Sequence, residues 1–175
     1  MSSSSPAPLP HVRDAVPADA DAIAAIYNHY VTETTITFEE EAIDGDELRR
    51  RMAAVHAASL PYLVAELDGR IGGYAYATKW KERVGYRFSA EISVYLAHDL
   101  GGRGLGSALY AALLERLRAR GVHAVLGGIA LPNAASVALH EKFGMVQVAH
   151  FRETGRKFGE WIDVGYWERI LEPGA

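Results

Sequence analysis

The chain has 175 residues, of which 49% are hydrophobic, and it carries a formal net charge of −4 at pH 7. This length and composition suit one folded domain with its own core and exclude a disordered chain. The three arginines at 49–51 have acidic neighbours, and the charge pattern gives no indication of nucleic-acid binding.

The sequence contains no cysteine, which excludes disulfides, thiolate metal sites and a cysteine nucleophile, and which fits a reducing compartment. The first ten residues, MSSSSPAPLP, lack the basic and apolar segments of a signal peptide, and their composition predicts a flexible tail. No apolar run approaches the roughly 20 residues that a membrane span needs. We expect a cytoplasmic protein with a tail over 1–10 and a single domain over 11–175.

Hydrophobic periodicity changes along the chain between the two-residue repeat of strands and the 3.6-residue repeat of helices. The clearest helix covers 104–121, with one leucine face and Gly121 as its C-terminal cap. Further helices are predicted over 17–31, 44–58 and 133–144. Strands are predicted over 11–16, 61–67, 71–80, 88–97, 123–131, 145–154 and 160–171, with 155–159 joining the last two. The order β-α-α-β-β-β-α-β-α-β-β indicates an α+β domain.

A glycine-rich loop, LGGRGLGS at 100–107, leads into the helix at 104–121. Such a loop can hold an anion, because the first N–H groups of a helix are unpaired and glycine allows close approach. The loop lacks the Gly-Lys-Ser/Thr ending of a P-loop, and Ser107 stands where a dinucleotide fingerprint needs its third glycine. An ordinary turn is the alternative, although four glycines in six positions exceed what a turn needs.

Five other segments accompany the loop: IYNHYV, LVAELDGRIGGYAYA, KWKERVGYRFSAEISVYL, LPNAASVALHEKFG and GRKFGEWIDVGYW. Together with the loop they resemble the GNAT N-acetyltransferases, and among these the phosphinothricin and methionine sulfoximine N-acetyltransferases. The likeness covers 11–171. It implies the GNAT fold, a mixed and mostly antiparallel central sheet flanked by helices, with acetyl-CoA as cosubstrate and a homodimeric assembly.

The resemblance also implies where the cofactor binds. The backbone of Ser93, Val94 and Tyr95 would hold the pantetheine arm like an added strand, and one of these N–H groups would polarise the thioester carbonyl. Asn133 and Ser136 match cofactor positions at the next helix start, where a plain N-cap explains Asn133 equally well. The pyrophosphate loop comprises Gly101, Gly102, Arg103, Gly104, Leu105 and Gly106.

The loop departs from the family pattern, Gln/Arg-x-x-Gly-x-Gly/Ala, at its first position, where Gly101 stands. This glycine removes a side-chain contact, so backbone N–H groups and Arg103 would carry the pyrophosphate. We therefore expect a lower affinity for CoA than is usual in the family.

Glu91 is the candidate general base. In SAEISVYL it shares a strand face with Ser93, whereas Ile92 and Val94 take the other face. Burial in a central sheet would raise its pKa and suit it to accept a proton near neutral pH. The alternative is a solvent-facing glutamate on an edge strand. By resemblance, Glu91 would deprotonate the amine directly or through water. Without a cysteine to carry the acetyl group, we expect direct transfer in a ternary complex.

His140 stands where many GNAT enzymes have a tyrosine that protonates the departing thiolate. The resemblance makes it a candidate acid, although its reach is shorter than that of tyrosine. The alternative, which the sequence favours, is a helix histidine packed beside Phe143. The segment HEKFG is not the zinc motif HExxH, and the other histidines show no metal-ligand spacing, so no metal site is expected.

The acceptor site would bind a small amino acid with a free α-amine and a polar or anionic head, which cationic and aromatic side chains recognise. The segment 79–88 supplies such residues, with a solvated loop as the alternative. Phe158 stands where enzymes of the herbicide-resistance type often carry histidine, which argues against the tightest specificity for phosphinothricin. The predicted acceptor residues are Trp80, Lys81, Glu82, Arg83, Tyr86, Ala90, Glu91 and Ile92.

The sequence thus predicts an acetyl-CoA-dependent N-acetyltransferase that acts on the α-amine of a small amino-acid analogue, such as phosphinothricin, methionine sulfoximine or methionine sulfone. Two alternatives stay open. One is a GNAT enzyme acting on protein N-termini or another amine, and the other is an acyl-CoA-binding sensor without turnover. Glu91 and the intact AEISVY segment argue against the sensor. Neither nucleic acid nor a membrane is expected as a partner.

Overall fold

The computed structural model describes residues 9–172, and the expected tail over 1–10 lies largely outside this range. The described strands form one seven-stranded sheet in the order β1-β2-β3-β4-β5-β7-β6. Among these pairs only β4–β5 is parallel, so the mixed and mostly antiparallel sheet is confirmed. The strands are β1 (His11–Asp14), β2 (Tyr62–Leu67), β3 (Arg70–Lys79), β4 (Ser89–Leu96), β5 (Ala124–Leu131), β6 (Val146–Lys157) and β7 (Glu160–Ile170).

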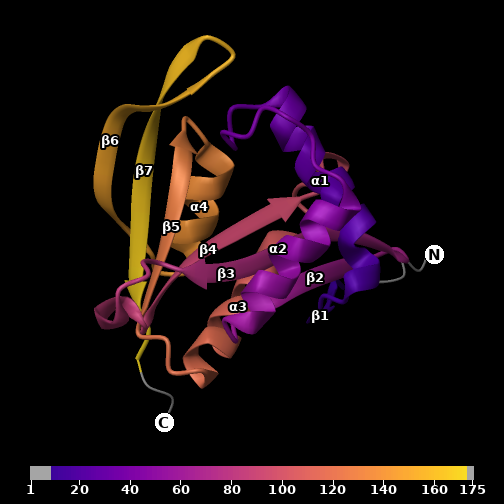
Figure 1. The fold of residues 1–175 in the computed structure, drawn as a ribbon, viewed down its shortest axis with the longest axis horizontal. Helices are drawn as coiled ribbons and strands as arrows, with labels where there is room; N and C mark the ends of the chain where they lie inside the picture. The colour runs from indigo at the N-terminus through magenta and orange to yellow at the C-terminus, as the bar shows by residue number, and fades with distance from the viewer. Residues whose placement is uncertain (1–8, 173–175) are drawn as a thin grey trace, which may run out of the picture.

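Helices cover both faces of this sheet, α1 and α2 on one side and α3 and α4 on the other (Figure 1). The two-residue repeat of the strands creates these layers, because Tyr62 and Val64 of β2 pack with α1 and α2 while Leu63 and Ala65 pack with α3. The helices are α1 (Ala20–Glu33), α2 (Gly45–Ala57), α3 (Leu105–Ala119) and α4 (Ala134–Lys142), with short 3₁₀ turns at Pro17–Asp19, Val84–Tyr86 and His98–Leu100.

Helix α3 has the leucine face that its periodicity predicts. Leu105, Leu109, Leu113 and Leu117 are each at most 1% exposed and pack against the sheet. Gly121 follows with a φ of 75°, a left-handed conformation typical of the residue after a helix. None of the helices in the described part of the chain has the length and apolar character needed to cross a bilayer.

The last hairpin differs from the sequence prediction. Strand β6 continues to Lys157 instead of ending at 154, and a turn at Phe158 and Gly159, both with positive φ, leads into β7. The reason is a register irregularity between Phe151 and Gly155, which takes up the extra residues and lets pairing resume. The Asp163 carboxylate accepts a hydrogen bond from the Glu153 backbone N–H at 2.8 Å and stabilises this irregular segment.

Candidate active site

Strands β4 and β5 pair in parallel only over Ser89–Glu91 and Ala124–Leu126, and beyond this point they diverge (Figure 1). The edge of β4 facing β5 therefore carries backbone groups that no described strand pairs. A groove of about 280 Å³ lies between β4, β5 and the start of α4. Of the residues predicted to hold the cofactor, the groove brings together Ser93, Val94, Tyr95, Gly101, Asn133 and Ser136.

The glycine loop continues from one end of this groove into α3. Gly102 and Gly104 have φ values of 75° and 82°, which glycine adopts without strain. A Cβ placed on Gly101, Gly102 or Gly104 would meet no atom of residues 9–172 within 4 Å, so the loop is open to a ligand. The side chain of Leu105 is instead buried, and a Cβ on Gly106 would come within 3.1 Å of an α4 side chain. These last two residues can reach a ligand only through their backbone.

Arg103 is the charged residue of the loop. Its Nη1 lies 2.8 Å from the Asp68 carboxylate in the turn between β2 and β3. The first N–H groups of α3 and the positive end of its dipole face the same loop. Because Asp68 offsets the charge of Arg103, the backbone N–H groups are the main donors that the loop offers to an anion.

The start of α4 borders the groove on its other side. The Asn133 side-chain oxygen accepts a hydrogen bond from the Ser136 backbone N–H at 3.1 Å, which is the geometry of an N-cap. Asn133 and Ser136 also line the groove, so the capping role does not remove them from it.

Glu91 lies where β4 and β5 separate, on the sheet face that α1 and α2 cover. Its carboxylate is half-buried, and the Tyr166 hydroxyl donates a hydrogen bond to Oε1 at 3.3 Å. Burial raises the pKa of Glu91, and the Tyr166 hydrogen bond and the charge of Lys81 partly oppose this rise. A raised pKa brings a carboxylate closer to the range in which a general base works best at neutral pH.

Aromatic side chains surround the Glu91 carboxylate on its β7 side. The rings of Trp80 and Tyr166 meet edge to face with centroids 5.4 Å apart, and Lys81 Nζ lies 4.8 Å from the Trp80 ring. Phe151 of β6 packs edge-on against Tyr166 at 6.0 Å. The structure thus brings Trp80 and Lys81 to Glu91 and adds Tyr166, which the sequence reasoning left without a role.

Of the other predicted acceptor residues, Glu82 lines the cavity between α2 and the strands β2 and β3, and the rest do not. The Glu82 carboxylate is 3.7 Å from Lys79 Nζ, and Arg83 and Tyr86 are exposed at the 3₁₀ turn, as a solvated loop would place them. The side chains of Ala90 and Ile92 are 1% and 3% exposed and pack toward α3, on the opposite face from Glu91. Only the backbone of Ala90 and Ile92 can therefore face an acceptor.

His140 is 4% exposed and has a hydrogen-bond partner at each ring nitrogen. Nδ1 lies 2.7 Å from the Ser136 carbonyl oxygen and must donate to it, so Nε2 accepts from the Tyr110 hydroxyl at 2.8 Å. Burial lowers the pKa of His140, which favours this neutral ring. The geometry matches a packing role. Within residues 9–172, no group of three or more His, Cys, Asp or Glu side chains could hold a metal ion.

Comparison with known proteins finds a matching family model and several similar acetyltransferases. Residues 12–165 match the family model described as an acetyltransferase (GNAT) domain. The chain is 43% identical to a phosphinothricin N-acetyltransferase of Alcaligenes faecalis, over 89% of this chain and 80% of the relative. It is 37% identical to an L-methionine sulfoximine/L-methionine sulfone acetyltransferase of Pseudomonas paraeruginosa, over 93% and 95% of the two chains.

A crystal structure of a phosphinothricin acetyltransferase from Sinorhizobium meliloti in complex with AcCoA has a TM-score of 0.90 and 34% identity, covering 94% of this chain and 90% of that one. The chain therefore belongs to the GNAT acetyltransferases, in the group of the phosphinothricin and methionine sulfoximine enzymes. The fold, the family and the N-acetyltransferase class predicted from the sequence are confirmed.

The burial of Glu91 has a measurable effect on stability. Because its pKa is raised in the folded state, the folded protein binds this proton more tightly than the unfolded chain does, and stability falls as the pH rises above the unfolded pKa. Glu91→Gln should therefore be at least as stable as the parent at about pH 8, with an advantage that shrinks toward about pH 4. Urea unfolding at both pH values measures this. Glu115→Gln, at an exposed position of α3, serves as the control, and a lower midpoint for Glu91→Gln at the higher pH would contradict the burial cost.

Proposed function

We propose that this chain is an acetyl-CoA-dependent enzyme that acetylates the α-amine of a small amino acid or amino-acid analogue by direct attack in a ternary complex. The observation that carries the proposal is the half-buried Glu91 at the point where β4 and β5 separate. Phosphinothricin and methionine sulfoximine, which the relatives' names give, are the first acceptors to test. Residues 11–175 would act as one catalytic domain, in the cytoplasm.

The groove supports acetyl-CoA as the donor. A pantetheine arm placed along β4 would pair with the backbone groups of Val94 that face the open edge, between Ser93 and Tyr95, and extend the sheet by one strand-like segment. The pyrophosphate would then lie on the loop 101–106, at the N-terminus of α3, where N–H groups and the helix dipole favour an anion. In this orientation the thioester would lie at the other end of the groove, beside Glu91.

The proposed reaction needs few groups. The ammonium of the acceptor gives a proton to the Glu91 carboxylate, directly or through water, and the neutral nitrogen attacks the thioester carbonyl carbon. A β4 N–H group stabilises the charge that develops on the carbonyl oxygen. The C–N bond forms, the C–S bond breaks, and the nitrogen loses its second proton as the CoA thiolate leaves. We assign protonation of the thiolate to this released proton or to water, since both ring nitrogens of His140 are engaged.

A thiol-release assay separates this proposal from its alternatives. Release of free CoA with methionine sulfoximine supports a small-acceptor enzyme. Release only with peptides that have a free N-terminus would support the alternative of protein N-termini. Tight acetyl-CoA binding without turnover on any amine would support a sensor.

The assignment of Glu91 as the base predicts a loss that is confined to turnover. Glu91→Gln removes the proton acceptor but keeps the size of the side chain, so kcat should fall by about 10²- to 10⁴-fold. The dissociation constant for acetyl-CoA, measured by calorimetry, should stay within about twofold of the parent because the groove backbone is unchanged. Equal turnover by variant and parent near neutral pH would exclude Glu91 as the base.

The glycine loop predicts a loss that is confined to cofactor binding. In Gly104→Val, a Cβ would project where the phosphates approach, and a branched side chain is strained at a φ of 82°. We expect CoA binding to weaken by at least about tenfold in calorimetry. Gly121→Val is the matched control, because Gly121 has a φ of 75° and open space around it at the opposite end of α3. An unchanged dissociation constant for the Gly104 variant would count against the loop.

We also propose the homodimer that the family resemblance implies. Strand β6 is an edge of the sheet, and its Val146, Val148 and Phe151 side chains are 61%, 50% and 49% exposed. An edge strand with unpaired backbone groups and exposed apolar side chains can pack against a second copy of the chain, which would bury both.

Light scattering after size exclusion should accordingly give twice the chain mass of 19.1 kDa. Val148→Lys should shift the mass to the monomer, because a charge would be buried in the contact. Val84→Lys, at a 75% exposed position of the loop 81–87, should remain dimeric. A monomeric parent protein would contradict the proposal.

A further inference from the structure

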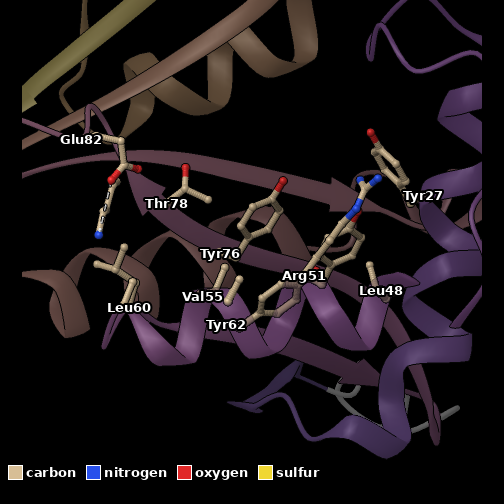
Figure 2. A pocket seen from close by; sticks show the side chains of 13 residues that line it. Tyr27, Leu48, Arg51, Val55, Leu60, Tyr62, Tyr76, Thr78 and Glu82 are labelled. Atoms are coloured by element: carbon tan, nitrogen blue, oxygen red, sulfur yellow. Dashed lines mark ion pairs between the residues drawn. The ribbon is translucent and has the colours of Figure 1, made fainter. Parts of the chain in front are cut away.

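A second cavity, of about 420 Å³, lies between α2 and the strands β2 and β3 (Figure 2). Its central lining is aromatic, with Tyr27, Tyr62, Tyr74 and Tyr76, and α2 supplies apolar side chains from its inner face. Figure 2 shows Tyr62 and Tyr76 in the middle, with Glu82 toward one end and Arg51 and Tyr27 toward the other. Neither the predicted cofactor residues nor Glu91 belong to its lining.

We propose that this cavity receives the side chain of the acceptor amino acid, and that it selects uncharged apolar or aromatic side chains over anionic ones. The inference rests on the proposed function, because it takes the acceptor amine to lie at Glu91. It goes further in naming the acceptor class, and it separates this chain from relatives named for phosphinothricin, whose side chain carries a phosphinate.

The cavity begins directly beside the catalytic carboxylate. Thr78 and Tyr76 line it, and in the antiparallel β3–β4 register they stand opposite Glu91 and Ser93. Side chains at directly opposed positions project from the same face with Cβ atoms about 5 Å apart. An amino acid whose nitrogen lies at Glu91 can therefore direct its side chain over Thr78 into the cavity. Its α-carboxylate can lie toward Lys81, whose charge already acts on Glu91.

The size and surface of the cavity suit a bulky apolar group. An apolar cavity of roughly 150 Å³ is known to hold a benzene molecule, so 420 Å³ has room for a phenyl or long aliphatic side chain. The Tyr62 and Tyr76 rings stack at 4.9 Å and an interplanar angle of 9°, which makes one wall flat and aromatic. Val55 and Leu60 provide aliphatic surface on another side.

The charges of the cavity argue against an anionic occupant. The Arg51 guanidinium is held by Glu39 at 2.6 and 3.0 Å and by Glu47 at 2.7 Å. Lys79, the other lining cation, lies 3.7 Å from the Glu82 carboxylate. Since Arg51 is already paired and the Glu82 carboxylate lies beside Lys79 and repels an anion, a phosphinate entering the cavity would lose more in hydration than it gains in ion pairing. An uncharged side chain has no such cost and gains from leaving water.

The test uses the full chain, acetyl-CoA and a panel of L-amino acids in the thiol-release assay. We expect kcat/KM for phenylalanine and norleucine to exceed that for phosphinothricin by at least about tenfold, a difference of about 1.4 kcal/mol in transition-state binding. Ala54→Trp places an indole at the cavity wall and should lower kcat/KM for phenylalanine by about tenfold or more while changing that for alanine by less than about twofold.

Ala53→Trp is the matched control, because Ala53 is the preceding residue of α2, is also exposed, and does not line the cavity. It should behave as the parent with every substrate. The inference is overturned if phosphinothricin is acetylated at least as efficiently as phenylalanine, or if Ala54→Trp affects phenylalanine and alanine equally.

A separate measurement distinguishes failure of this inference from failure of the proposed function. If no amine is acetylated, the proposed function fails, and calorimetric titration with N-acetyl-L-phenylalanine, the product of the proposed reaction, then decides the cavity. Binding that Ala54→Trp weakens and Ala53→Trp preserves would support the cavity as a site for apolar side chains. Absence of binding to the parent, or equal binding to both variants, would overturn it.

Discussion

The separation of β4 from β5 after three paired residues is the constraint on which the rest of the site depends. A strand in the middle of a sheet normally has both edges paired, and its backbone is then unavailable to ligands. Here β5 turns to pair along its whole length with β7, and the released edge of β4 becomes the wall of a groove. Glu91 is the last β4 residue before the separation, and its carboxylate is half-buried on the sheet face that α1 and α2 cover.

Helix α4 packs closely against β5, at a glycine of the strand that separates from β4. A Cβ on Gly127 would lie 2.4 Å from His140 Nε2, so only glycine lets the α4 histidine reach Tyr110 of α3. The neutral His140 ring joins Tyr110 to the Ser136 carbonyl. It thereby connects the helix that begins at the glycine loop with the helix that begins at Asn133. In the proposed complex this buried Tyr110–His140 pair fixes the positions of the starts of α3 and α4 relative to each other, and both border the cofactor groove.

Most of the fold was predictable from the sequence because its layers follow from periodicity, as the α3 leucines and the alternating residues of β2 illustrate. The partial burial of Glu91 and its raised pKa were also predictable, because the residue lies in an apolar strand of the central sheet. The role of Tyr166 was not, because its contact depends on how β7 lies relative to β4, two strands away in the sheet. The extension of β6 depends on a bulge held by Asp163, and the tyrosine cavity depends on the packing of α2 across β3. Both features depend on contacts between residues far apart in the sequence, so no local sequence pattern predicts them.

Backbone hydrogen–deuterium exchange with and without CoA is the decisive measurement, because the proposed cofactor surface consists of unpaired backbone groups on β4 rather than side chains. CoA should protect the amides of Ile92, Val94 and Leu96, which face the open edge of β4, and those of the loop 101–106, while β1 and β2 exchange as before. Such a pattern would show that the open edge of β4 is the cofactor surface. Unchanged exchange along β4 under saturating CoA, or protection confined to the cavity beneath α2, would contradict the account.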